Sequence, residues 1–474
     1  MKNISYLDMV AELLDEKEFL QFKNEYEKPI TKSVKLINKR WWKIFINNYL
    51  QKERTLDEPD FSFQWNKYND VVFATRKEWL KPDSLWNSSL HQAWLIYVQE
   101  MAAGLSVQML WVQPWDKVLD VCAAPGGKSI QISDKLVDWF LISNEPDLWR
   151  KKALESNLYR CWVYNDAVIQ QDGCVIWEKF PECFDKVLVD APCSWEWMQY
   201  KSWKKVWQWD EKKVRQLSDL QKKLLISWLK SLKVWGELVY STCTTNVLEN
   251  ECVISEVLKK YWDSVELIEV PLKERSEWII QWRWNDILSL EDAKKVARFW
   301  PHIQKTGWFF ISKFRKNKSL EWNKEWVINN INNLSLENLV RNKLDELWVS
   351  IDDKFSFVRW KYTINVSLKS LVDFHAESEF LEAEIGLPIF KILQDSKTNQ
   401  EKLIPLAWIS KVFWNNVKNK IDIDDEQFKN LMNKWDLRDD RLKDFEWKYV
   451  ILKWNWIWVG MVSVQNWIWK NKCF

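Results

Sequence analysis

The chain has 474 residues, with 69 Lys and Arg against 67 Asp and Glu, and a formal net charge of +2. This length allows two to four domains with their own cores, and the near-neutral charge excludes a globally basic nucleic-acid-binding protein. The sequence has no run of about 18 apolar residues and its N-terminus has no apolar signal-peptide core, so we expect a cytoplasmic protein without a membrane span. Eight cysteines without a CxxC pair favour neither a zinc site nor disulfides, so we expect no metal and a reducing compartment.

The ratio of tryptophan to glycine is abnormal, with 38 Trp and 8 Gly. Ordinary usage of about 7% would give about 33 glycines in a chain of this length. Many tryptophans also stand where a turn favours Gly, such as Trp115, Trp235 and Trp454. We hypothesise that most of them are Gly in the cell, encoded by UGA in a lineage that reads this codon as Gly. The alternative is a truly Trp-rich protein with stacking platforms, and UGG codons in the gene would establish it.

Residues 1–104 are expected to form an accessory RNA-binding region with a small α+β structure. Met9, Leu13, Leu14 and Phe19 have helical spacing up to Pro29. Alternating apolar residues, as in 70–75, predict strands before residue 80. Residues 91–110 then predict a connecting strand or turn followed by a helix.

Residues 105–315 are expected to form a doubly wound α/β domain, because apolar strands alternate with helical segments from residue 118 onward. The expected strands are 118–122, 140–145, a short one near Val163, 186–192, 237–244 and 306–314. The expected helices are a segment ending at Leu136, 151–161, 211–232 and 249–260.

The remaining sequence predicts two C-terminal parts. Residues 316–400 are expected to comprise a polar linker and a first C-terminal domain of mixed helix and strand. Residues 401–474 are expected to form a small β-barrel, because apolar residues alternate with turn positions over 449–474.

Four strings end the predicted central strands: DVCAAPGGK at 120–128, SNEPD at 143–147, LVDAPCS at 188–194 and YSTCT at 240–244. In a doubly wound sheet such positions meet at one edge, where ligands bind. Gly126 and Gly127 let a ligand approach the backbone closely. Glu145 stands where an acidic side chain accepts hydrogen bonds from ribose hydroxyls. Together these features predict a nucleotide-type cofactor site.

Two cysteines make the prediction more specific. Cys193 and Cys243 each follow an apolar strand, so both thiols are expected to face one pocket. C5 of cytosine is a poor nucleophile until a thiolate adds to C6, which makes a cysteine useful for methylation at C5. A lone cysteine at a strand end would more simply be a small buried hydrophobe. Because both Cys193 and Cys243 stand in such strings, a catalytic role is favoured over a purely structural one.

With ENE at 249–251 and RFWPH at 298–302 leading to TGWFF, these strings resemble the Sun family of RNA cytosine-5 methyltransferases. The resemblance is strong over about 30–315. It continues more weakly to 458–471, which is similar to a pseudouridine-synthase-and-archaeosine-transglycosylase-like (PUA-like) domain. It implies an α/β fold, with a Rossmann-like methyltransferase core, a small α+β N-terminal region and a C-terminal PUA-like β-barrel that binds RNA.

The resemblance also implies the cofactor and the roles of the site residues. The methyl donor would be S-adenosyl-L-methionine, bound by Cys122, Ala123, Ala124, Pro125, Gly126, Gly127, Lys128, Glu145, Asp172 and Asp190. Asp166 is an alternative to Asp172. Cys243 would be the nucleophile on C6 and Cys193 would promote breakdown of the covalent adduct. Asp190 would hydrogen-bond the target ring, and Lys128 would either do the same or position Asp190.

The implied partner is RNA, first of all small-subunit ribosomal RNA or the small ribosomal subunit. A cytosine in tRNA or in another rRNA is the alternative substrate, and an inactive RNA-binding assembly factor is the alternative function. The sequence departs from the family at Trp195 and Trp197, where the family has Ser-Gly-x-Gly, and at Trp308, the second glycine of TGGFF. True tryptophans there would cripple the enzyme. The basic segment 200–223 is expected to follow RNA phosphates, or else to be a solvated helix face.

Overall fold

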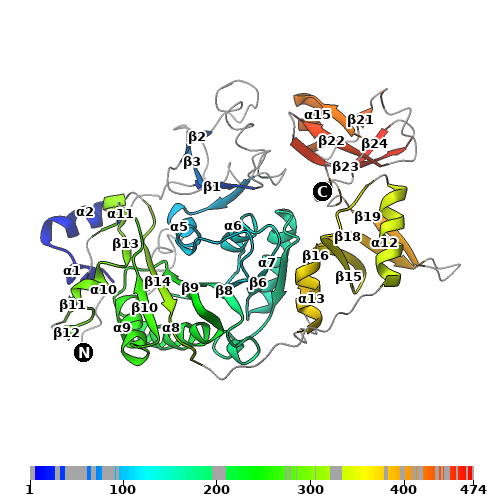
Figure 1. Ribbon diagram of the computed structural model, residues 1–474. Helices are drawn as coiled ribbons and strands as arrows, with labels where there is room; N and C mark the ends of the chain where they lie inside the picture. The colour runs from blue at the N-terminus through cyan, green and yellow to red at the C-terminus, as the bar shows by residue number, and fades with distance from the viewer. Residues whose placement is uncertain are drawn as a thin grey trace.

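The computed structural model of the chain is drawn in Figure 1. It describes residues 6–26, 33–37, 61–65, 71–76, 91, 96–194, 210–320, 334–377, 383–394, 401–432, 437–438, 441, 449–454, 457–465 and 468–471, apart from 273–274, 277–278, 284, 305, 348, 407–408, 410–412 and 414–419.

A nine-stranded mixed sheet forms the centre of the molecule (Figure 1). Its order is β10-β14-β9-β8-β5-β6-β7-β17, with β13 paired to β14. The strands are β5 (Val118–Asp120), β6 (Leu141–Asn144), β7 (Asp166–Ile169), β8 (Phe184–Asp190), β9 (Leu232–Thr242), β10 (Val265–Ile268), β13 (Ala297–Phe299), β14 (Phe309–Lys316) and β17 (Glu384–Ile385). The five strands β5 to β9 are parallel. The strand order reverses between β5 and β8, which is where a doubly wound sheet binds its ligands.

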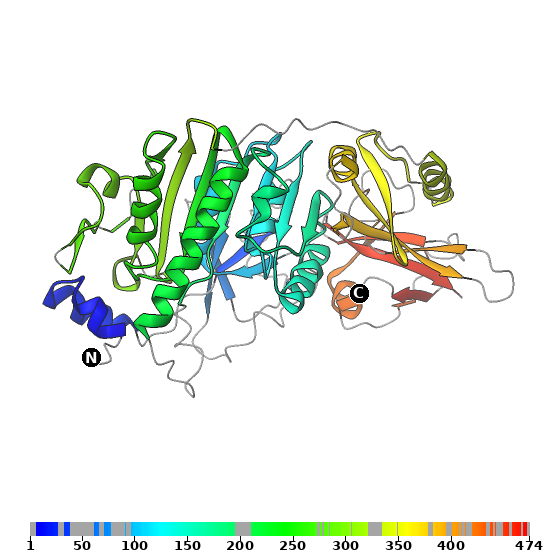
Figure 2. The same cartoon turned by 90° about the horizontal axis from the view of Figure 1, so that it is seen from below.

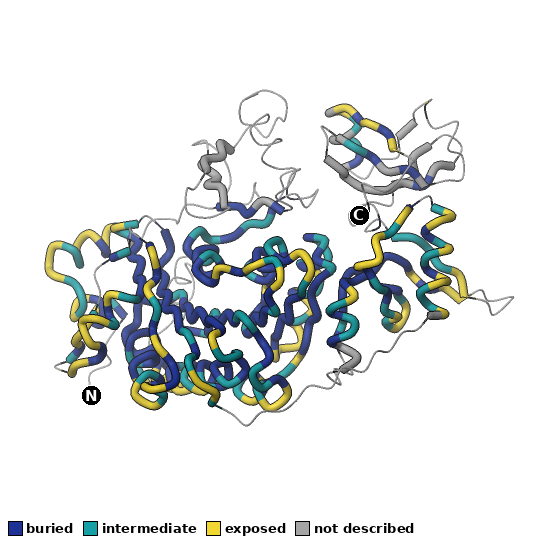
Figure 3. Tube along the Cα trace, in the orientation of Figure 1, coloured by how far each residue is buried: buried dark blue, intermediate teal, exposed yellow. Residues whose placement is uncertain are grey.

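Helices cover both faces of this sheet because alternate strand residues point to opposite sides. Val118 packs in the cluster that contains α5, whereas Leu119 and Val121 pack in the cluster that contains α8 and α9. Figure 2 shows the long α8 on the lower face, and Figure 3 shows the central strands as buried. The helices of this block are α5 (Met101–Leu110), α6 (Gly127–Ser133), α7 (Leu148–Arg160), the 3-10 turn η1 (Ile176–Glu178), α8 (Glu211–Ser231), α9 (Glu251–Lys260), α10 (Leu290–Ala293) and α11 (Pro301–Gln304).

The alternation of strands and helices expected from the sequence is therefore confirmed, with shifts at some boundaries. The strand expected near Val163 begins only at Asp166. Asp147 and Asp210 cap the N-termini of α7 and α8 by accepting hydrogen bonds from the backbone amides of Arg150 and Lys212. A two-stranded ribbon, β11 (Gln281–Trp282) and β12 (Asn285–Asp286), precedes α10.

The described residues of the N-terminal region form two helices and a small sheet. The single helical start expected from the sequence is divided into α1 (Tyr6–Ala11) and α2 (Glu16–Tyr26). The sheet has the order β2-β3-β1-β4, and its strands are β1 (Ser33–Leu36), β2 (Phe61–Trp65), β3 (Val71–Arg76) and β4 (Ile96–Gln99). Lys35 of β1 is buried and pairs with Asp134 at the end of α6, which fastens this sheet to the central domain.

A second α+β unit follows, with α12 (Leu334–Glu346), β15 (Phe355–Trp360), β16 (Thr363–Leu368), α13 (Lys369–Glu377), β18 (Leu387–Gln394) and β19 (Glu401–Pro405). Its sheet has the order β15-β16-β18-β19, so the β18–β19 hairpin lies on both sides of residue 400. The unit is joined to the central domain: β17 pairs with β7, and the ring of Phe374 lies 4.8 Å from that of Phe140.

The last described residues form a five-stranded sheet of order β20-β22-β23-β24-β21. Its elements are β20 (Lys420–Ile423), α15 (Asp425–Met432), β21 (Leu437–Arg438), β22 (Tyr449–Trp454), β23 (Ile457–Gln465) and β24 (Ile468–Asn471). Only the β20–β22 pairing is parallel among its described pairs. In the described parts of the chain, no helix combines the length and apolar character that crossing a bilayer requires.

Backbone conformation bears on the abnormal tryptophan content. Trp111, Trp162 and Trp235 have φ values of 51°, 60° and 68°, in the left-handed region that glycine adopts without steric cost. Trp111 is the C-cap of α5, a position at which glycine is common. These backbone angles support the hypothesis that such residues are Gly in the cell.

Candidate active site

The turn between β5 and α6 comes close to its neighbours at both glycines. Gly126 has φ of +109°, which disfavours any residue with a Cβ. A Cβ on Gly127 would lie 2.9 Å from Cε1 of Tyr97. The helix α7 holds the turn from outside, because Asn157 Nδ2 donates to the Pro125 carbonyl at 2.8 Å and Arg150 donates to the Ala124 carbonyl at 2.9 Å. The backbone of this turn is thus fixed in a form that glycine allows.

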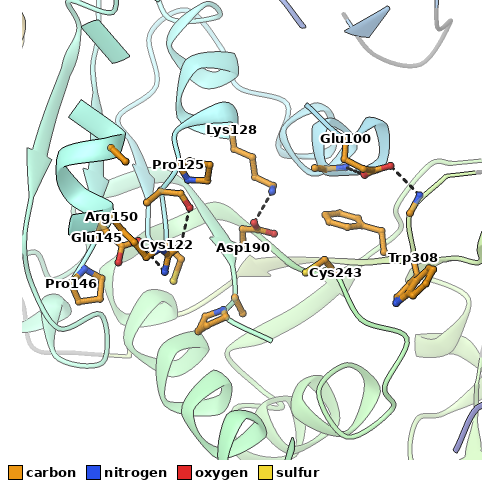
Figure 4. Close-up of a pocket in the computed structure, with 17 residues that line it drawn as sticks. Glu100, Cys122, Pro125, Lys128, Glu145, Pro146, Arg150, Asp190, Cys243 and Trp308 are labelled. Atoms are coloured by element: carbon orange, nitrogen blue, oxygen red, sulfur yellow. Dashed lines mark hydrogen bonds and ion pairs between the residues drawn. The ribbon is translucent and has the colours of Figure 1, made fainter. Parts of the chain in front are cut away.

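A cavity of about 520 Å³ opens beside this turn at the carboxyl ends of the parallel strands. This size is in the range of small-molecule sites. Its lining residues are Glu100, Ala103, Cys122, Ala124, Pro125, Lys128, Glu145, Pro146, Arg150, Ala153, Asp190, Ala191, Pro192, Cys243, Gly307, Trp308 and Phe309. Figure 4 shows Glu145, Pro146 and Arg150 at one end, with Cys243 and Trp308 toward the other. We name these the cofactor end and the cysteine end.

Glu145 brings a buried carboxylate to the cofactor end. Its side chain is 1% exposed, and burial raises the pKa of this carboxyl above its usual value. Oε1 accepts a hydrogen bond from the backbone amide of Asp147 at 3.1 Å, and Oε2 lies 3.4 Å from the Arg150 guanidinium. Oε2 accepts no hydrogen bond from the described residues. An acceptor in this condition is suited to a hydroxyl donor from a ligand.

Lys128 and Asp190 lie between the two ends (Figure 4). Lys128 Nζ is 2.6 Å from Asp190 Oδ2, and Ser241 donates a hydrogen bond to Oδ1 at 2.9 Å. Burial alone would lower the pKa of Lys128, but the adjacent carboxylate of Asp190 outweighs it and the pKa lies above its usual value. Of the two roles expected for Lys128, positioning Asp190 matches this contact.

The two cysteines expected to share a pocket lie side by side. Cys193 Sγ and Cys243 Sγ are 3.0 Å apart, although the residues are 50 positions apart in the chain. Cys243 lines the cavity and is partly exposed, whereas Cys193 is 7% exposed and lies behind it. The parallel pairing of β8 and β9 explains their proximity, because Cys243 directly follows β9 and Cys193 lies three residues beyond the end of β8.

Several other expected site residues do not line the cavity. Ala123, Gly126 and Gly127 belong to the turn but are not among the lining residues. Asp172 is exposed and accepts a hydrogen bond from the Cys174 amide, and neither it nor its alternative Asp166 lines the cavity. Asp166 is buried, which raises the pKa of its carboxyl well above the usual value. Cys122 does line the cavity, and burial raises the pKa of its thiol.

Of the three tryptophans at positions where the family has glycine, Trp308 belongs to the described residues. Trp308 is 1% exposed, lines the cysteine end, and packs with its ring 6.1 Å from Phe22. Trp195 and Trp197 lie outside the described residues, as do residues 200–209 of the basic segment. The rest of that segment begins α8.

Sequence reasoning missed three parts of the site. Arg150 follows the capping Asp147, a signal for a helix but not for a ligand contact. Glu100 joins the cysteine end by accepting hydrogen bonds from the hydroxyl of Thr306 and the amide of Gly307, more than 200 residues away. Glu249 holds the backbone next to Cys193. Only its place in the ENE string distinguished it in the sequence.

The parallel sheet, the glycine turn, the buried acid after β6 and the paired cysteines together define a Rossmann-like methyltransferase site. A family model described as 16S rRNA methyltransferase RsmB/F matches residues 107–315. A ribosomal RNA small subunit methyltransferase F from Photobacterium profundum is 30% identical over 321 residues, 67% of this chain and 64% of that protein. A tRNA (cytosine(49)-C(5))-methyltransferase from Pyrococcus abyssi is 36% identical over 223 residues, 47% of this chain and 70% of that protein.

Among solved structures, a methyltransferase homolog protein from Pyrococcus horikoshii superimposes with a TM-score of 0.53 and 27% identity, over 64% of this chain and 92% of that chain. This chain belongs to the Sun family of RNA cytosine-5 methyltransferases. It spans 64% of the length of the Photobacterium relative.

Proposed function

We propose that this protein transfers a methyl group from S-adenosyl-L-methionine to C5 of a cytosine in RNA. The observation that carries the proposal is the 3.0 Å separation of the Cys193 and Cys243 sulfurs beside the Lys128–Asp190 pair. Two thiols at one end of a cavity and a buried carboxylate acceptor at the other fit a reaction that needs a covalent catalyst and a nucleotide-like methyl donor.

The residues at the cofactor end fit this donor. The hydrogen-bond acceptor left open on Glu145 Oε2 suits a ribose hydroxyl, and Cys122, Ala124, Pro125 and Lys128 of the glycine turn line the cavity beside it. Asp190, and Asp172 from the loop after β7, would complete the set. When bound, S-adenosyl-L-methionine supplies an electrophilic methyl group. The chain supplies its orientation toward the cysteine end.

The cysteine end would perform the chemistry on the base. Cys243 Sγ forms a bond to C6 of the cytosine, and the electrons of the C5–C6 double bond make C5 nucleophilic. Asp190, held by Lys128 and Ser241, hydrogen-bonds the ring and offsets charge that develops on its N3 edge. After methyl transfer, loss of the C5 proton restores the double bond and breaks the bond between sulfur and C6. Cys193 promotes this breakdown.

The substrate is proposed to be small-subunit ribosomal RNA, because the relative that covers 67% of this chain is named for that substrate. The tRNA methyltransferase relative covers 47% of the chain and makes a tRNA cytosine the alternative. The five-stranded sheet at 420–471 is proposed as a PUA-like RNA-binding domain and the N-terminal sheet as a further RNA contact. The target base must leave its stack to reach the cysteines.

A second candidate function is that of an RNA-binding assembly factor without methyltransferase activity. Trp308 favours it, because an indole lines the cysteine end where the family has glycine. Codons that specify Trp at 308 in the gene would favour this candidate. UGA codons read as Gly would favour the enzyme.

The test is incubation of the protein, translated with the cell's own code, with small ribosomal subunits or tRNA and a labelled methyl donor. We expect transfer to a cytosine in small-subunit rRNA, its loss in Cys243→Ala, and accumulation of a covalent RNA adduct in Cys193→Ala. Transfer that survives Cys243→Ala would overturn the mechanism. Absence of transfer to either RNA would favour the assembly factor.

A further inference from the structure

Glu249 makes an unusual set of contacts directly behind the two cysteines. Its side chain is buried, and it lies in the loop between β9 and α9. Oε1 accepts hydrogen bonds from the backbone amide of Ser194 at 3.0 Å and from Gln221 Nε2 at 2.9 Å. Oε2 accepts the hydroxyl of Ser194. Among the described residues, this carboxylate accepts from three donors, two of them on the residue that follows Cys193.

The residue before Cys193 is held by the same pair of side chains. Gln221 of α8 is buried, and its Nε2 also donates to the carbonyl of Pro192 at 2.8 Å. Both backbone neighbours of Cys193 are thus fixed by Glu249 and Gln221. We call Glu249 and Gln221 the anchor of Cys193. The position of the Cys193 thiol depends on this anchor, because Cys193 has a short side chain and lies in the loop after β8.

The backbone around Glu249 is in turn tied to the strand that carries Cys243. Tyr240 of β9 donates its hydroxyl to the Glu249 carbonyl at 2.6 Å, and Asn250 donates to the Thr244 carbonyl at 3.0 Å. Glu249 therefore connects the loop of Cys193 with the strand end of Cys243.

The chemistry of the contacts requires a carboxylate. The three described donors converge on Glu249, and an ionised carboxylate is the side chain that only accepts. A glutamine would have a single oxygen, and its amide would bring further donors against Ser194 or Gln221. An aspartate would be one methylene short of them.

We propose that Glu249 is a positioning residue for the adduct-release step, holding Cys193 against Cys243. The proposal rests on the methyltransferase function proposed above. Glu249 is not among the residues that line the cavity, so its loss should leave attack by Cys243 intact and impair only the breakdown that Cys193 promotes.

The test compares Glu249→Gln, Cys193→Ala and the double variant, using small ribosomal subunits and S-adenosyl-L-methionine. Denaturing gels report the covalent protein–RNA adduct, and quenched single-turnover assays separate its formation from its release. We expect formation of the adduct at the unaltered rate and release slowed by up to about 10²-fold in Glu249→Gln, the scale of the effect of a small misplacement. The double variant should be no slower than Cys193→Ala, because both changes act on one step.

Glu251→Gln is the matched control. Glu251 is equally buried and pairs with Arg298, so this variant loses stability without losing the anchor of Cys193. It should melt at a lower temperature and accumulate no adduct. If Glu249→Gln does not fold, Ser194→Ala removes one donor to Glu249 and should slow release in the same direction by a smaller factor.

The outcomes separate the two proposals. Accumulation of adduct in Cys193→Ala without accumulation in Glu249→Gln and Ser194→Ala would overturn the role of Glu249 alone. An equal fall in the rates of formation and release in Glu249→Gln would do the same. A Cys193→Ala protein that releases RNA normally would instead contradict the division of labour between the cysteines.

Discussion

The cofactor end and the cysteine end of the cavity differ in how much of the chain builds them. The cofactor end is formed by one continuous stretch, from Cys122 to Ala153, that begins just after β5 and runs through the turn, α6, β6 and the first part of α7. The cysteine end collects residues from around 100, 190, 243 and 308. A local pattern can specify the first end, whereas the second exists only after distant segments have packed. Four substitutions test this difference, from the largest expected effect to the smallest.

Asp190→Asn should have the largest effect, because Asp190 lies where the two ends meet. Its carboxylate accepts from Lys128 and Ser241, and an amide would replace one accepting oxygen by a donor facing the ammonium group. We expect kcat to fall by about 10²- to 10³-fold, the range for loss of one preorganised electrostatic group. Single-turnover methyl transfer measures this. Asp219→Asn, on the exposed side of α8, should be unaffected, and a change within two-fold at Asp190 would contradict the assignment.

Glu145→Gln should affect the cofactor end alone. A hydrogen bond to a charged group contributes about 1.5–3 kcal/mol, so the KM for S-adenosyl-L-methionine should rise by about 10- to 100-fold. The KM for RNA should not change. Initial rates with each substrate varied in turn distinguish the two, and the exposed Glu178→Gln serves as control. A matching rise in the KM for RNA would show that the cofactor end and the cysteine end do not bind their substrates independently.

Asp120 predicts a pH dependence of stability at the base of the cofactor end. Burial raises the pKa of its carboxyl to about 7, although a hydrogen bond from Ser129 opposes the shift. The folded protein therefore holds a proton there that the unfolded chain has lost, between an unfolded pKa of about 3.9 and the folded value. This group should lower the free energy of unfolding as pH rises through that window, by up to about 1.4 kcal/mol per pH unit.

Asp120→Asn carries no charge and keeps an oxygen for Ser129. Its stability relative to the unaltered protein should therefore increase from pH 5 to pH 7 and level off above. Denaturant midpoints at several pH values measure the difference. Parallel curves for the two proteins would show that Asp120 titrates at its ordinary pKa.

Trp235→Gly should have the smallest effect, and a favourable one. Trp235 is 70% exposed with φ of 68°, a conformation that costs a side-chain-bearing residue roughly 1–2 kcal/mol. Glycine should raise the free energy of unfolding by about 1 kcal/mol. Trp262→Gly is the control, because Trp262 is 80% exposed without a positive φ and should give no gain. Equal changes in the free energy of unfolding for Trp235→Gly and Trp262→Gly would show that the positive φ of Trp235 is not the cause of the gain.

The sequence predicted the cofactor end and the proximity of the cysteines for one reason. A strand followed by a small-residue turn is a local pattern, and parallel strands bring their carboxyl ends together whatever lies between them. The contacts of Glu100 with Thr306 and Gly307 could not be predicted, because they depend on how α5 packs against β14. The anchor formed by Glu249 and Gln221 could not be predicted either, because it depends on how α8 packs beside the loop after β9. The exact placement of the loop after β7 leaves Asp172 outside the cavity lining, a detail that spacing alone does not determine.

The pairing of β17 with β7 has a consequence for the integrity of the catalytic domain. Without Glu384 and Ile385, β7 would be the last strand on its side of the sheet, with a row of free amide and carbonyl groups. Such an edge recruits strands from other molecules. We therefore expect a catalytic fragment cut at residue 330 to self-associate through the exposed edge of β7, because it would lack the strand β17 that covers this edge.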